Sequence, residues 1–191
     1  SELMPLADRS LLLDVAAAGS RLVAVGDRGH VLLSDDQGAS WRQVVVPTRA
    51  MLTGVAFADE RRGWAVGHDG VILITGDAGA TWTRQDPGND LDSVWLDVGC
   101  DRDGAVIAVG AYGKFAVSRD AGKTWSGSQP SGDESHYNQI TVTSAGELIL
   151  SGETGLLLRS RDHGATWQRA ELPYDGSLFG SLALGDGHYL A

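Results

Sequence analysis

The sequence lacks the features that mark several large classes of protein. Its single cysteine, Cys100, cannot form a disulfide within the chain, so packing must stabilise the fold. Its apolar runs, such as Val44 to Val46 and Val71 to Ile74, are far too short to span a bilayer. The first residues show no charged, apolar and small-residue targeting pattern. The residues therefore indicate neither a membrane-spanning helix nor a disulfide framework.

Basic and aromatic residues are scarce as well. The chain has 15 Lys and Arg against 25 Asp and Glu, which gives a formal net charge of -10 at pH 7. Nucleic acids and anionic lipid surfaces attract proteins of the opposite charge. We therefore expect no nucleic-acid partner and no direct membrane insertion.

Glycine, by contrast, is abundant, and much of it falls in a repeat. Four times a Gly-x-x-Gly pair is followed, at a fixed offset, by Ser/Thr-x-Asp-x-Gly-x-Ser/Thr-Trp. The copies run from Gly26 to Trp41, Gly67 to Trp82, Gly110 to Trp125 and Gly152 to Trp167. A period of about 42 residues indicates a tandem array of one supersecondary unit, whose copies must stack to bury a shared core.

Within the second copy the residues predict four strands. Leu52 to Ala58 and Gly63 to Gly67 are the first two, and a two-residue hairpin at His68-Asp69 leads to the third, Val71 to Ile74. Thr81 to Gln85 alternates between apolar and polar residues and is the fourth. Four antiparallel strands in forty-odd residues are typical of a propeller blade. We therefore expect an all-β fold.

The acidic turn of each repeat resembles the Asp-box, also called the bacterial neuraminidase repeat (BNR). The Asp carboxylate can accept backbone N–H groups of its own turn, Gly permits a positive φ, and Trp anchors the turn to the sheet. Identical residues in every blade cannot easily converge on one site, so we expect them to be structural and not catalytic. These residues are Asp36, Gly38, Trp41, Asp77, Gly79, Trp82, Asp120, Gly122, Trp125, Asp162, Gly164 and Trp167.

The longer pattern from Gly63 to Trp82, with its Gly-Trp-Ala-Val-Gly segment, resembles the photosystem II stability and assembly factor family, which includes bacterial members. The resemblance covers nearly the whole chain. It implies a seven-bladed propeller that acts as an assembly chaperone on the lumenal or periplasmic side of a membrane, without catalytic residues. The sequence departs from the plant and cyanobacterial members because it has no comparable cluster of arginines.

The expected architecture is a β-propeller of four-stranded antiparallel blades with Asp-box turns, with about four and a half of the seven blades present. Residues 1–191 should form a single propeller portion, with blades at approximately 11–47, 51–87, 92–130 and 136–173 and the start of a fifth at 177–191. An open array exposes an apolar blade face, which allows self-association through that edge.

Two classes of enzyme share the Asp-box. Sialidases need an arginine triad, a Tyr-Glu nucleophile pair and an acid, but their Phe-Arg-Ile-Pro segment is absent. Xyloglucan-active hydrolases carry catalytic aspartates on blade loops and are the better enzymatic competitor. His68 and His136 have no partner at metal-ligand spacing, so we expect no metal and no cofactor.

Strand topology separates two faces of the array. The Asp-boxes occupy one face, and the longer, variable connections occupy the other. Residues that differ between the repeats, and that can recognise a specific partner, therefore lie on this second face. The candidate partner-binding residues on this second face are Arg28, Arg49, His68, Asp69, Asn89, Asp90, Tyr112, Lys114, His136, Tyr137, Glu153, Tyr174 and Phe179.

These observations predict a non-enzymatic protein-binding scaffold or assembly factor for a membrane protein complex. The alternative is a glycan-binding or polysaccharide-hydrolysing Asp-box propeller. The family resemblance implies action in the periplasm or elsewhere in the cell envelope, after removal of a signal peptide, with a membrane protein or complex as the partner.

Overall fold

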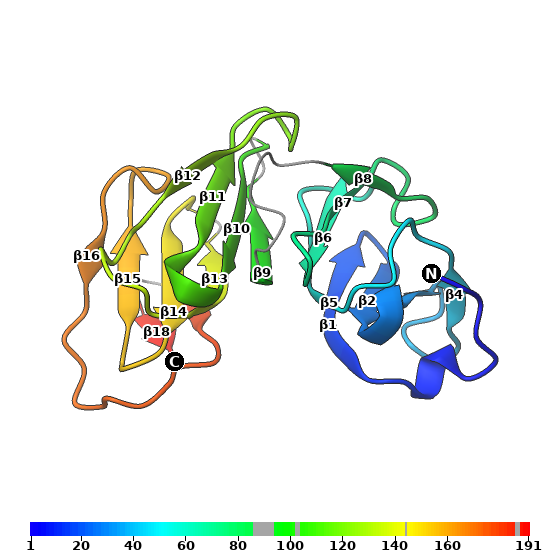
Figure 1. Cartoon of the computed structure of the whole chain (residues 1–191), viewed down its shortest axis with the longest axis horizontal. Coiled ribbons are helices and arrows are strands. Elements are labelled where there is room, and N and C mark those ends of the chain that lie inside the picture. Colours follow the sequence, from blue (N-terminus) through cyan, green and yellow to red (C-terminus); the bar gives the residue numbers. More distant parts are fainter. Residues whose placement is uncertain (86–93, 102–103, 144, 186–187) are drawn as a thin grey trace.

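The computed structural model describes residues 1–85, 94–101, 104–143, 145–185 and 188–191, and it is built mainly of antiparallel strands (Figure 1). Blade 1 contains β1 (Leu12–Ala18), β2 (Arg21–Gly26), β3 (Val31–Ser34) and β4 (Arg42–Val44). Blade 2 contains β5 (Leu52–Phe57), β6 (Gly63–Gly67), β7 (Ile72–Thr75) and β8 (Thr83–Gln85). Blade 3 contains β9 (Trp95–Cys100), β10 (Val106–Gly110), β11 (Phe115–Ser118) and β12 (Ser126–Ser128).

Blade 4 contains β13 (Tyr137–Val142), β14 (Leu148–Gly152), β15 (Leu157–Ser160) and β16 (Gln168–Arg169), and a two-stranded sheet of β17 (Leu182–Gly185) and β18 (His188–Leu190) follows it. The described part also includes the short 3-10 helices η1 (Ala7–Arg9), η2 (Asp27–Gly29) and η3 (Ala111–Gly113). No helix in it has the length and apolar character needed to cross a bilayer.

Each blade is an antiparallel meander whose strands pair in sequence order. The first strands of successive blades pack together, β1 on β5, β5 on β9 and β9 on β13, so they form the inner wall of the array. Figure 1 shows blades 1 and 2 in one half of the molecule and blades 3 and 4 with the two-stranded sheet in the other. The expected all-β class and the four-stranded antiparallel blades are confirmed.

Most of the apolar core lies between neighbouring blades. In β6, Ala65 packs with residues of blade 1, whereas Trp64 and Val66 pack with residues of blade 3. Because both faces of the blade are covered, β6 is continuously buried and its sequence does not alternate between apolar and polar residues. The blades are therefore held together by the packing that the repeat period predicted.

The Asp-box geometry is the same in each blade. In blade 2, Thr75 Oγ1 donates to Asp77 Oδ1 at 2.8 Å and accepts the Gly79 N–H at 3.0 Å, while Thr81 N donates to Asp77 Oδ1 at 2.8 Å. These donors favour the ionised carboxyl and hold the pKa of Asp36, Asp120 and Asp162 at about 2. The boxes are thus closed hydrogen-bonded turns.

The Gly-x-x-Gly pair has a packing reason. A Cβ at the first glycine, Gly67, would lie 2.0 Å from the carbonyl oxygen of Met51, which accepts the His68 N–H at 2.9 Å. A Cβ at the second glycine of blade 1, Gly29, would lie 2.5 Å from Thr48 O, and its φ is +67°. The pair therefore lets two backbone segments cross the hairpin at close range.

Candidate binding face

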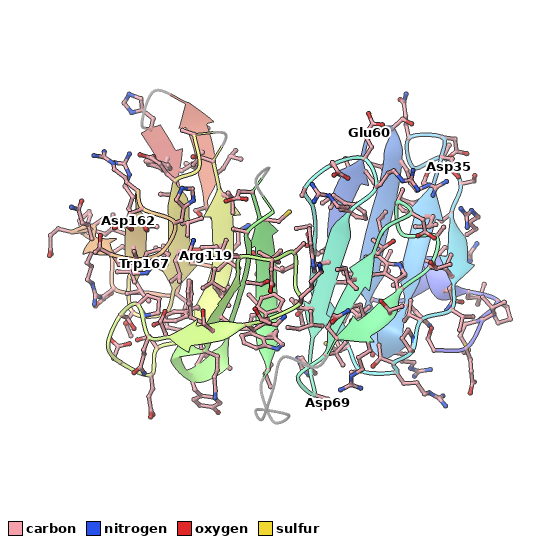
Figure 2. All side chains as sticks on the ribbon, turned by 90° about the horizontal axis from the view of Figure 1, so that it is seen from above. Asp35, Glu60, Asp69, Arg119, Asp162 and Trp167 are labelled. Carbon is pink, nitrogen blue, oxygen red and sulfur yellow. The ribbon has the colours of Figure 1, made fainter. Side chains whose placement is uncertain are left out.

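The hairpin between the second and third strands of each blade carries one exposed residue in the left-handed conformation. These residues, which we call the tip residues, are Arg28, Asp69, Tyr112 and Thr154, with φ of 56°, 57°, 56° and 54°. Each is followed by a buried glycine that also has positive φ, as a type I′ hairpin turn requires. Figure 2 shows Asp69 at the edge of the molecule opposite Glu60 and Asp35, which belong to turns of the Asp-box side.

The tip residues occupy this conformation at an energetic cost. A left-handed backbone costs an L-residue roughly 1–2 kcal/mol, and it is especially unfavourable for a β-branched residue such as Thr154. Glycine would avoid that cost, yet all four positions carry side chains, each of a different type. Two of the turns are braced from the outer strand, since Arg84 donates to Asp69 O and Arg169 to Thr154 O, both at 3.4 Å. Such strain is concentrated at functional sites in proteins.

An aromatic cluster surrounds the tip of blade 3. Tyr112 is 64% exposed, and its ring meets the His136 ring edge-on with centroids 4.6 Å apart. His136 Nδ1 lies 3.7 Å from Glu153 Oε1, and the His136 N–H donates to Glu153 Oε2 at 3.1 Å. The cluster therefore joins blade 3 to blade 4 and presents a large aromatic surface to solvent, beside a carboxylate.

Blade 1 has a pocket of about 410 Å³ beside its tip. Its lining comes from Met4, Pro5, Leu6, Ser10 and Leu11 of the N-terminal segment and from Asp27, Arg28 and His30 of the hairpin. His30 Nδ1 lies 2.8 Å from Ser10 Oγ, and burial lowers the pKa of His30. The apolar floor of this pocket suits an apolar side chain of a partner. The exposed guanidinium of Arg28 at the rim suits a hydrogen-bond acceptor close to that side chain.

The remaining expected contact residues differ in how far they are exposed to solvent. Tyr174 and Phe179 are 55% and 80% exposed, while His68, Lys114 and Glu153 are half-buried. Arg49 is exposed but pairs with Glu2 at 3.1 Å. Asn89 and Asp90 lie outside the described residues.

Tyr137 does not fit its expected contact role. It is the first residue of β13, it is fully buried, and its hydroxyl lies 2.6 Å from Ser131 Oγ and accepts the Ser131 N–H at 3.0 Å. The chain has already entered the inner strand at this residue, so the side chain points into the core between blades 3 and 4. Tyr137 is therefore a packing residue.

Sequence reasoning also missed two carboxyls on the inner wall. Asp14 of β1 accepts the N–H of Val15 at 2.8 Å and the N–H of Val55, in the next blade, at 2.7 Å. Asp97 of β9 does the same for Val98 at 2.8 Å and for Ile140, in the next blade, at 3.0 Å. An acid in an otherwise apolar inner strand was the available signal.

Burial raises the pKa of Asp97 to about 7, and the negative charge of Asp14 contributes to this rise. Burial raises the pKa of Asp14 as well. Raised carboxyl pKa values are typical of general acids. Here, however, both oxygens of each carboxylate are occupied by backbone N–H groups of two blades. No cluster of three or more metal-ligating side chains occurs among the described residues. The two carboxyls therefore hold neighbouring blades together through hydrogen bonds.

The Asp97→Asn variant is expected to lose a pH dependence of stability. The folded pKa of Asp97 lies above its unfolded value, so the folded state binds the extra proton, and wild-type stability should rise as pH falls from about 7 to about 4. The gain should be a few kcal/mol at most. The introduced asparagine cannot titrate, and its amide NH2 group would face one of the two N–H donors, from which it cannot accept a hydrogen bond. The variant should therefore be less stable than wild type at pH 5.

Urea unfolding at pH 5 and pH 8 measures this difference, with the exposed Asp175→Asn as the control for loss of a carboxylate. Equal pH dependence of wild type and Asp97→Asn would contradict the assignment. Comparing the two proteins cancels the opposing contribution of His30, whose lowered pKa costs stability on acidification.

Comparisons with known proteins identify a similar family and similar folds. Residues 33–94 match the family described as photosynthesis system II assembly factor YCF48. No curated protein matches the sequence. The structure of YCF48 bound to a D1 peptide is similar, with a TM-score of 0.74 and 17% identity over 93% of this chain and 58% of that one. For YCF48 from Cyanidioschyzon merolae the TM-score is 0.70 and the identity 18%, over 87% and 58% of the two chains.

Glycoside hydrolases share the architecture. The GH74 xyloglucanase from Xanthomonas campestris has a TM-score of 0.63 and 18% identity, over 84% of this chain and 29% of its own. At such identities these likenesses establish the fold, and the chain spans 58% of the length of the two YCF48 structures. The partial β-propeller is thereby confirmed. On its repeats, its family match and its fold, the chain is a BNR-repeat β-propeller similar to the photosystem II assembly factor YCF48 family.

Proposed function

We propose that the chain is a non-enzymatic protein-binding scaffold, an assembly factor for a membrane protein complex that acts from the periplasmic or lumenal side. The partner binds the face that carries the tip residues, and an extended segment of it crosses several blades. The aromatic cluster at Tyr112 and the blade 1 pocket at Arg28 are the principal anchors, because aromatic and Arg side chains dominate binding energies at protein interfaces.

One observation carries this proposal: the four tip residues keep different side chains in a conformation that favours glycine. The opposite face also carries left-handed residues, Gln37, Ala78, Ala121 and His163, but two of the four are alanine and all lie in a turn that has the same Asp, Gly and Trp in every blade. A varied face on an invariant scaffold supports selective binding of one partner.

The comparisons support the same conclusion. The matched family is described as an assembly factor, and one similar structure is of YCF48 bound to a D1 peptide. Peptide binding by a protein of the same fold favours a protein partner for this chain. The closed hydrogen bonding of the Asp-boxes and of the inner-wall carboxyls favours a non-catalytic role.

The test uses a variant that removes a tip side chain without straining the fold. Tyr112→Gly should keep or slightly raise stability, because glycine tolerates φ of 56°. We expect it to weaken capture of a specific membrane protein from a detergent-solubilised envelope extract at least tenfold, as loss of a central aromatic anchor does.

The matched control is Ala121→Gly. Ala121 has φ of 60° in the Asp-box turn of the same blade, so this change relieves the same backbone conformation on the opposite face. It should leave capture unchanged. If Tyr112→Gly and Arg28→Gly together retain the partner as well as wild type does, the tip face is not the binding face.

A glycan-active propeller is the second candidate, favoured by the GH74 structures of the same fold. Incubation with xyloglucan, with reducing ends and affinity electrophoresis as readouts, separates the two. Release of reducing ends, or retardation that Tyr112→Gly abolishes, would move the assignment to this candidate. We expect neither.

A further inference from the structure

An exposed tyrosine and several carboxylates lie together on the tip face where blade 3 meets blade 4. We propose, on the basis of the protein-binding function above, that the bound segment of the partner carries a basic side chain, best an arginine, at this point. The basic group lies against the ring of Tyr112 and pairs with the carboxylate of Glu153. The partner is thus a protein with an extended basic segment.

The backbone brings the parts of this site together. The connection from blade 3 to blade 4 passes between the hairpins of the two blades. On the blade 3 side, Gly113 N donates to Ser135 O at 3.0 Å, and a Cβ on Gly113 would lie 3.6 Å from the Cα of Glu134. On the blade 4 side, Glu153 N donates to His136 O at 3.2 Å. The site therefore lies inside the array, with blade 2 beyond blade 3 and the β17–β18 sheet beyond blade 4 (Figure 1).

Tyr112 provides the aromatic surface, and it alone among the four tip residues carries a ring. The ring is 64% exposed and meets the His136 ring edge-on, with the two planes at 76°. The face of an aromatic ring attracts an ammonium or guanidinium group that lies within about 6 Å of its centre. Because the Tyr112 ring already packs against its neighbour, little conformational freedom is lost when a cation binds to it.

Glu153 places a carboxylate beside that ring. Its Oε2 accepts the His136 N–H at 3.1 Å, its Oε1 lies 3.7 Å from His136 Nδ1, and its side chain is 41% exposed. The carboxylate is therefore oriented before a partner arrives and keeps a part that solvent can reach. A planar guanidinium can stack on an aromatic ring and form a charged hydrogen bond with a carboxylate, so an arginine uses both groups.

The connections beside the site are acidic. Residues 129–136 follow blade 3, residues 170–178 follow blade 4, and neither connection contains a lysine or an arginine. Their exposed acids are Asp133, Glu134, Glu171 and Asp175. The blade 3 hairpin adds Lys114, and the outer strand of blade 4 adds Arg169. Together with Glu153, the acids outnumber these two basic residues, so the region favours a partner of positive charge.

This charge suits a protein segment and not a metal ion. No group of three or more metal-ligating side chains occurs in the part of the chain that the structure describes. Asp133 serves its own turn, since its Oδ1 accepts the Ser131 hydroxyl at 2.8 Å and the Ser135 N–H at 3.0 Å. The connection after blade 1, residues 45–51, contains Arg49 and no acid. The change of charge along the tip face therefore directs the basic part of the partner segment to blades 3 and 4.

Selection of a random library of short peptides on the immobilised chain tests this inference. The peptides that bind should be enriched in arginine and lysine and depleted in aspartate and glutamate. Their affinity, measured by fluorescence anisotropy, should fall as salt rises, because ions screen exposed charges. It should fall about fivefold in the Glu134→Gln/Glu153→Gln double variant and about tenfold in Tyr112→Gly. Glutamine at position 153 can still accept the His136 N–H, so the double variant should stay folded.

Glu60→Gln is the matched control, because it removes an exposed carboxylate from a turn on the Asp-box side (Figure 2). It should bind the selected peptides as wild type does. Selected peptides without a basic bias overturn the inference, as does equal affinity for wild type and the double variant. A library that yields no binder dependent on Tyr112 overturns it too. The proposed function fails by a different result, capture of the membrane protein that survives both Tyr112→Gly and Arg28→Gly.

Discussion

Replacing Trp82 by alanine is expected to cost about 3–5 kcal/mol of folding stability, as removal of a buried aromatic side chain does. The indole is 6% exposed, its Nε1 donates to Gly79 O at 2.9 Å, and its ring meets that of Phe57 edge-on with centroids 6.3 Å apart. The cavity would open in the core between blades 1 and 2. Because domains have only about 5–15 kcal/mol of net stability, the variant should be partly unfolded at physiological temperature.

Urea unfolding followed by far-UV circular dichroism measures this loss. Trp125→Ala is the matched control: it removes the same side chain from an equivalent Asp-box, where the indole is only half-buried and donates to Gly122 O at 3.2 Å. The control should cost distinctly less. A Trp82→Ala protein within about 0.5 kcal/mol of wild type, the range of ordinary surface changes, would contradict the anchoring role.

The second large effect is expected at the first glycine of the Gly-x-x-Gly pair. A Cβ on residue 67 would lie 2.0 Å from Met51 O, a backbone atom that cannot move aside without breaking its hydrogen bond from His68. Gly67→Ala should therefore cost about 3 kcal/mol or more, although alanine is usually the better residue in a strand. The effect is steric and does not come from the unfolded state.

Gly76→Ala is the control for this prediction, because no atom lies within 4 Å of a Cβ at that position. We expect its stability to stay within about 0.5 kcal/mol of wild type. Thermal and urea unfolding of the two variants side by side gives the comparison. If Gly67→Ala unfolds like Gly76→Ala, the close backbone crossing does not exist in solution.

The strands, the Asp-box turns and the separation of the two faces could be predicted from sequence because they depend on local patterns. A period of about 42 residues fixes the blade, and antiparallel pairing then places the hairpins on the face opposite the Asp-boxes. Tyr137 could not be placed in this way, since it follows a long variable connection and its polar neighbours hide the start of β13. The strand pairing shows that Tyr137 occupies the position of Leu52 and Trp95, each of which is paired with the first glycine of the Gly-x-x-Gly pair in its own blade.

An acid in an otherwise apolar strand marks the positions of the inner-wall carboxyls, but their role could not be predicted for a different reason. Asp14 and Asp97 lie on non-adjacent blades, and their hydrogen bonds cross from one blade to the next. The repeat predicts that the blades stack, but it does not give the register between neighbouring inner strands, on which these N–H partners depend. The blade 1 pocket is similar, because the N-terminal segment that forms one of its walls has no counterpart in the repeat.

Photo-crosslinking tests the central claim, that a protein partner binds the tip face, most directly. A photoreactive amino acid is introduced at position 112 or 154, on the tip face, and at position 123 or 165, in Asp-box turns on the opposite face. After irradiation in an envelope extract, the account predicts crosslinks to one membrane protein from positions 112 and 154 and none from positions 123 and 165. Crosslinks to that protein from the Asp-box positions alone would contradict it.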